Sequence, residues 1–137
     1  MKFRTIEGVG MSRAAIDGLG RKLMSDYVAV LRKHSSALLE GERYRGATWY
    51  EDKYAALRSL DLAQREAVSR LLDDLVVSSC HAMLELFDKD GLLDSKVEGR
   101  LALKVVDGRG IEVDASISSD GLAGELYGEN GWLERFG

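Results

Sequence analysis

The sequence predicts a single α+β domain in which three N-terminal helices precede an antiparallel β-hairpin and a short C-terminal helical cap. Apolar residues first recur every three or four positions and then, from about residue 97, alternate with polar residues. A chain of 137 residues with 45% hydrophobic residues suits one globular domain with a buried core. No internal repeat or linker divides the chain, so we expect one domain over residues 1–137.

The first helix is expected to begin at Ser12, a favourable N-cap, after a short strand or arm formed by residues 1–10. Its apolar face repeats at helical spacing over residues 16–31. Gly18 and Gly20 each lower helix stability by up to ~1 kcal/mol relative to alanine. We therefore expect its first turns to be separate or bent.

A second helix is expected after the polar residues 41–46. Thr48 and Glu51 form a capping-box pattern, in which the side chain and backbone of the two residues satisfy each other's hydrogen bonds. This pattern predicts that the second helix starts at Thr48.

The third helix, expected at about residues 62–87, is predicted to be the central core helix. Asp61 and Gln64 form another capping-box pattern at its start. Its second half, residues 75–87, is almost entirely apolar, which is typical of a helix that is buried on most sides. We expect the rest of the domain to pack around it.

The next segment predicts a β-hairpin with strands at about 97–106 and 111–117, because apolar and polar residues alternate in both. The turn at 108–110 has three residues, and Gly110 suits the left-handed position of a G1 bulge. This turn predicts the cross-strand partners Leu101 with Ile117, Leu103 with Ala115, Lys104 with Asp114, and Val105 with Val113.

The C-terminal residues predict two short helical turns that cap the core. Leu122 and Leu126 lie four residues apart, as do Trp132 and Phe136. We expect Trp132, Leu133 and Phe136 to dock on the core; the alternative is an exposed aromatic patch for a partner.

Four polar residues share one face of the central helix, at spacings of four, three and four: Asp74, Ser78, His81 and Glu85. One interpretation is a site in which His81 acts as a general base, or binds a metal together with Glu85. The favoured interpretation is a solvated stripe, because a zinc site takes at least three protein ligands. We predict neither a metal nor a cofactor.

Asp88, Asp90 and Gly91 resemble the beginning of a calcium-binding loop. The twelfth position of that loop would be Gly99 instead of the glutamate that the template requires. A turn that ends the central helix is the better interpretation.

Charge is distributed unevenly along the chain. Residues 1–60 carry 11 Lys and Arg against 7 Asp and Glu, whereas residues 61–137 carry 8 against 16. An acidic half suits a basic partner protein, and the overall pI of about 5.2 disfavours nucleic acid. The candidate acidic interface consists of Glu112, Asp114, Asp120, Glu125 and Glu129.

We therefore expect a non-catalytic, cytosolic protein-binding domain that presents its acidic C-terminal half to a basic partner. Cys80 is the only cysteine, which fits a reducing compartment, and we predict no membrane contact because no segment approaches ~20 apolar residues. Immunity proteins that neutralise basic toxins belong to this class of small acidic domain, although no motif identifies a family. The alternative is a small enzyme, or a small-ligand or metal binder, that uses His81 and Glu85.

Overall fold

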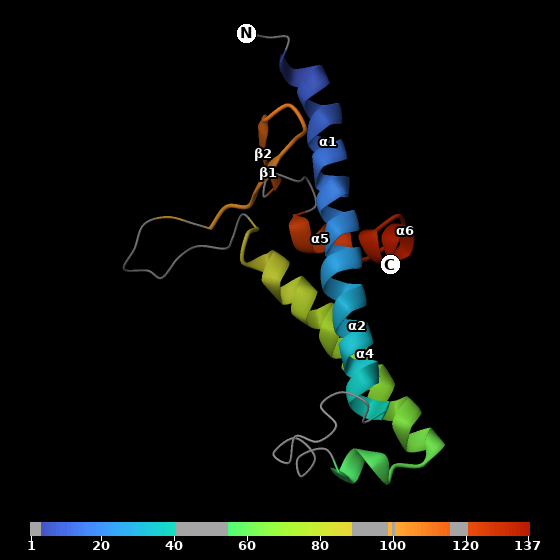
Figure 1. Cartoon of the computed structure of the whole chain (residues 1–137). Coiled ribbons are helices and arrows are strands. Elements are labelled where there is room, and N and C mark those ends of the chain that lie inside the picture. Colours follow the sequence, from blue (N-terminus) through green and yellow to red (C-terminus); the bar gives the residue numbers. More distant parts are fainter. Residues whose placement is uncertain (1–3, 41–54, 89–98, 100, 116–120) are drawn as a thin grey trace.

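The computed structural model describes residues 4–40, 55–88, 99, 101–115 and 121–137. Its longest feature is one continuous helix from Arg4 to Glu40, which runs down the molecule in Figure 1. This helix consists of α1 (Arg4–Leu23), the π-helical segment η1 (Met24–Val28) and α2 (Ala29–Glu40).

Two expectations for the N-terminal part are wrong. The helix begins at Arg4 instead of Ser12, so residues 4–10 are neither a strand nor an arm, and it continues without a break through Gly18 and Gly20. The hairpin strand β1 (Lys104–Val106) and the C-terminal helix α6 (Trp132–Phe136) both contact α1, and this tertiary support outweighs the low helix propensity of glycine.

The helix count also differs from the three N-terminal helices expected: the elements before the hairpin in the described ranges are α1, η1, α2 and α4 (Leu62–Glu85). The predicted capping box of Thr48 and Glu51 lies outside the described residues, while residues 55–58 are helical.

The next long helix, α4 (Leu62–Glu85), starts where the sequence predicts and ends two residues earlier than expected. The capping box is confirmed: the backbone N–H of Gln64 donates to Asp61 Oδ1 at 2.8 Å, and the backbone N–H of Asp61 donates to Gln64 Oε1 at 3.0 Å. α4 crosses the long helix at η1 and α2 (Figure 1) and also contacts α5 (Leu122–Leu126).

α4 is less buried than its composition predicts. Of its residues, Val76, Cys80 and Leu84 are buried, whereas Leu71 and Leu75 are each 64% exposed. The reason is geometric: η1, α2 and α5 cover one side of α4, and its opposite side faces outward. The core is instead shared between the long helix, α4 and the C-terminal helices.

That core is one cluster of buried residues from α1, η1, α4, the end of the hairpin and the C-terminal helices. Its members are Ile16, Met24, Val28, Val76, Cys80, Leu84, Ala115, Leu122, Ala123, Leu126 and Trp132.

The hairpin consists of β1 (Lys104–Val106) and β2 (Glu112–Asp114) and has the predicted register. Lys104 faces Asp114 and Val105 faces Val113, while Gly110 has a positive φ of 77°. Both strands are shorter than expected, and the partner predicted for Leu101 lies outside the described residues.

The C-terminal cap is confirmed as two short helices, α5 (Leu122–Leu126) and α6 (Trp132–Phe136). Trp132 is fully buried, and Leu133 and Phe136 pack against the core with part of their surface exposed. These aromatic residues therefore complete the core, as predicted, instead of forming an exposed patch.

Candidate functional site

The polar stripe of α4 (Asp74, Ser78, His81 and Glu85) lies on one side of the helix, and its residues are exposed except for His81, which is partly buried. The His81 ring lies against the ring of Tyr127, with 5.3 Å between the ring centroids. His81 Nε2 lies 3.8 Å from Glu85 Oε1, which is too far for a hydrogen bond. No described residue pairs with Asp74.

The surroundings of His81 bear on the two interpretations of this stripe. An enzyme or small-ligand site would place His81 beside a cavity, and His81 is not among the described residues that line the pocket beside α1 and the hairpin turn, the pocket around Arg13 and Glu125, or the pocket between α2 and α4. Within the described ranges, no three His, Cys, Asp or Glu side chains converge as a metal-binding group. Asp74, Ser78 and Glu85 are exposed, so the stripe forms a polar strip on the surface of α4.

Beside the polar stripe runs a row of apolar residues at spacings of four, seven and four, here named the outer row: Leu71, Leu75, Ala82 and Leu86. Leu71 and Leu75 are each 64% exposed, and Leu86 is 53% exposed. At 100° per residue, the row lies on the side of α4 opposite the buried residues.

The sequence led us to expect residues 75–87, which include Leu75 and Leu86, to be buried on most sides, so the outer row was missed. The signal that separates them is the presence of two apolar series on one helix. Val76, Cys80 and Leu84 form one series and are buried, whereas the outer row forms another series on the far side.

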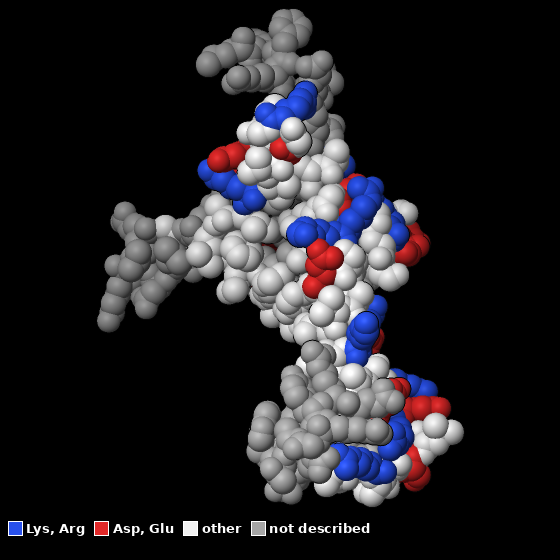
Figure 2. Space-filling model, in the orientation of Figure 1, with Lys and Arg blue, Asp and Glu red and all other residues white. Residues whose placement is uncertain are grey.

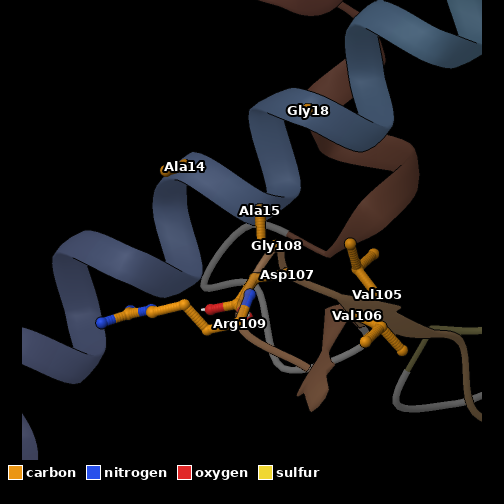
Figure 3. A pocket seen from close by; sticks show the side chains of 8 residues that line it. All are labelled: Ala14, Ala15, Gly18, Val105, Val106, Asp107, Gly108 and Arg109. Carbon is orange, nitrogen blue, oxygen red and sulfur yellow. Dashed lines mark hydrogen bonds and ion pairs between the residues drawn. The ribbon is translucent and has the colours of Figure 1, made fainter. Parts of the chain in front are cut away.

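A groove lies between α1 and the turn of the hairpin, with a volume of about 420 Å³ (Figure 3). Ala14, Ala15 and Gly18 form its helical wall, and residues 105–109 form the other wall. The backbone N–H of Ile111 donates to the Asp107 carboxylate and is the main cause of a lowered pKa for Asp107, with Arg109 contributing in the same way. Because that carboxylate is engaged in the turn, the groove is mainly an apolar surface.

The predicted acidic interface is dispersed in the structure. Glu112 is exposed and accepts a hydrogen bond from Lys104 Nζ at 3.1 Å, and Glu129 is exposed near α6. Asp114 is half-buried, Glu125 is only 6% exposed, and Asp120 lies outside the described residues. In the face shown in Figure 2, acidic and basic side chains are interspersed.

Glu125 is held by a network of charges that joins α1, α5 and α6. The two terminal nitrogens of Arg13 each lie 2.6 Å from one carboxylate oxygen of Glu125, and Arg13 also bonds to Asp17 at 3.0 Å. Arg135 lies 2.8 Å from the other oxygen of Asp17. The hydrogen bond from Arg135 is the main cause of a lowered pKa for Asp17, and the hydrogen bond to Glu125 is the main cause of a raised pKa for Arg13.

Arg13, Glu125 and Arg135 of this network line a polar pocket of about 260 Å³ together with Gly124, Tyr127 and residues 129–131. Within the network, the two arginines balance the carboxylates of Asp17 and Glu125 in charge. Because each of the four charged groups already has an opposite partner, the network ties the C-terminal cap to α1.

No protein-family model, curated protein or solved structure matches this chain. None of the helices in the described ranges combines the length and apolar composition of a membrane span. We therefore infer function from the geometry and the charge of the surface.

Proposed function

We propose that this chain is a non-catalytic protein-binding domain that receives its partner on the outer face of α4. The observation that carries the proposal is the outer row, in which three leucines are more than half exposed on one side of a single helix. Single exposed apolar residues are common, but a contiguous row with a polar border is typical of a protein interaction site.

The charge beside the row supports a basic partner. Asp74 and Glu85 are exposed along the same edge, and Asp74 is paired with no described residue. Lysine or arginine side chains on a partner would complement this edge. By contrast, Glu112 and Glu125 are already paired with Lys104 and Arg13 within the chain.

The proposal is tested by photocrosslinking in the cells that produce the protein. A photoreactive p-benzoylphenylalanine replaces Leu75 in the outer row, and a second variant carries it at Lys22, whose side chain is 75% exposed on α1. We expect a discrete protein adduct from position 75 that is absent from position 22. The adduct should also disappear when Leu71→Glu is added, because a charge in the row opposes apolar docking.

Two results would contradict the proposal. One is the absence of any protein adduct from positions 71, 75 and 86. The other is the same set of adducts from position 22 as from position 75, which would indicate nonspecific capture.

A further inference from the structure

We propose that the partner covers the outer row with a single basic amphipathic helix, an inference that rests on the proposed protein-binding function and specifies its partner. It follows from three properties of the outer face of α4: the spacing of the row, the charge along one edge, and the lack of charge along the other.

The outer row is straight enough to lie along a helical partner. Its intervals of four, seven and four residues average 3.75 per turn when the gap of seven is counted as two turns, close to the 3.6 residues per turn of an α-helix, so the row keeps to one side of α4. From Leu71 to Leu86 the row is about 22 Å long at ~1.5 Å per residue, so a partner helix of about 16 residues would cover it.

The two edges of the row differ in charge. One edge is the polar stripe, with the carboxylates of Asp74 and Glu85, and His81 Nε2 lies 3.8 Å from Glu85 Oε1. The other edge consists of uncharged residues: Val68, Leu72, Ser79 and Met83. A complementary helix therefore carries lysine or arginine on one flank of its apolar face.

The same carboxylates disfavour three other occupants. A second copy of the chain, paired antiparallel so that Leu71 meets Leu86, would bring Asp74 of each copy beside Glu85 of the other, with four carboxylates along one seam. An anionic lipid surface and a nucleic acid would both be repelled by Asp74 and Glu85.

The test uses two synthetic peptides of about 18 residues with leucine at seam positions, which differ only in having lysine or glutamate on one flank. Their binding to the full chain is measured by fluorescence anisotropy at low salt. We expect the lysine peptide to bind at least about tenfold more tightly than the glutamate peptide. Leu75→Ala should lower the affinity for the lysine peptide by about tenfold, because the variant loses the apolar contact that Leu75 makes with the peptide.

The charge requirement is tested with two matched double variants. The double variant Asp74→Asn with Glu85→Gln should lower the affinity for the lysine peptide by about three- to thirtyfold, since two exposed ion pairs with the peptide are lost. Glu112→Gln with Glu129→Gln also removes two carboxylates and should leave binding unchanged. Circular dichroism and thermal unfolding of all variants should match the parent, because the altered side chains are exposed.

The inference is overturned if neither peptide binds, if the Asp74 and Glu85 variant binds like the parent, or if the control variant loses as much affinity. A dimer in sedimentation that Leu75→Ala dissociates would also overturn it, since a second copy would then occupy the row. If position 75 crosslinks to a partner segment that is extended or acidic, the helix inference fails while the proposed function stands. If positions 71, 75 and 86 all give no adduct, both fail.

Discussion

Arg13 donates hydrogen bonds from both terminal nitrogens to Glu125, each 2.6 Å from a different carboxylate oxygen, although the two residues are 112 positions apart in sequence. Glu125 is 6% exposed, whereas the Arg13 side chain is 45% exposed. A bidentate arginine–carboxylate pair is stronger than a single charged hydrogen bond, and the buried carboxylate depends on it. This pair is therefore a main attachment of the C-terminal cap to α1.

Arg13→Ala should lower the free energy of unfolding by about 1–2 kcal/mol, because it leaves the Glu125 carboxylate buried without its partner. The loss is smaller than the 3–5 kcal/mol of a fully buried pair because water reaches Arg13. Urea unfolding measures the change. Lys22→Ala breaks a fully exposed pair with Asp26 and serves as the control; an equal loss in both variants would contradict the assigned role of Glu125 burial.

Gly18 and Gly20 should respond in opposite ways to alanine. A Cβ at Gly20 would lie 2.5 Å from ring atoms of Trp132, whereas a Cβ at Gly18 would meet no atom within 4 Å. Gly20→Ala should therefore destabilise the protein by about 1–3 kcal/mol through overpacking, and Gly18→Ala should stabilise it by up to about 1 kcal/mol through helix propensity. Thermal unfolding of the two variants decides this, and a stabilised Gly20→Ala would show that Trp132 does not lie against this turn.

Stability should fall in acid partly because of Asp17. Its pKa lies below the ordinary 3.8, chiefly because Arg135 donates a hydrogen bond to the carboxylate. A carboxyl group whose folded pKa is lowered contributes stability that is present above 3.8 and is lost as pH falls through the folded pKa. Asp17→Asn should reduce stability at about pH 6 and make the decline towards pH 2.5 shallower, as measured by urea unfolding at each pH.

Some decline should persist in Asp17→Asn, because the pKa values of Asp107 and Asp26 are also lowered. An unchanged acid profile in Asp17→Asn would show that the bond with Arg135 does not operate in solution.

Asp88, which follows the end of α4, should contribute to the stability of the folded protein. Its carboxylate accepts hydrogen bonds from the backbone N–H groups of Leu122 and Ala123, at the start of α5. Asp88→Ala should cost about 1 kcal/mol, the usual effect of removing a side chain that caps a helix. Asp74→Ala removes an exposed acid from α4 and should leave the urea midpoint unchanged; a similar loss from both would argue against the cap.

Features encoded within a few residues were predictable from the sequence. Asp61 and Gln64 form their capping box because both partners lie in one helical turn, and Gly110 sets the hairpin register by its own backbone conformation. The two C-terminal helices were also predicted correctly, because Leu122 and Leu126 lie four residues apart, as do Trp132 and Phe136.

Features that depend on distant contacts were not predictable. Gly20 was expected to weaken a helix, yet it provides the space for Trp132. Glu125 was expected at a surface interface, yet it is buried and held by Arg13. Leu75 read as a core residue because composition reports how apolar a helix is without reporting which of its sides are covered. In the candidate site, the spacing of the polar stripe was enough to place it on one face of α4. The exposure of the outer row could be recognised only once the elements that pack against α4 were known.

The contact between Gly20 and Trp132 also has a consequence for the order of folding. Helix α4, with its own capping box, can form from local interactions, but Trp132 reaches its place only after the chain has closed a loop of more than one hundred residues. Docking of the C-terminal cap is thus expected as a late event in folding. Trp132, shielded from water in the finished structure, would report that event through its fluorescence after helical circular dichroism has already developed.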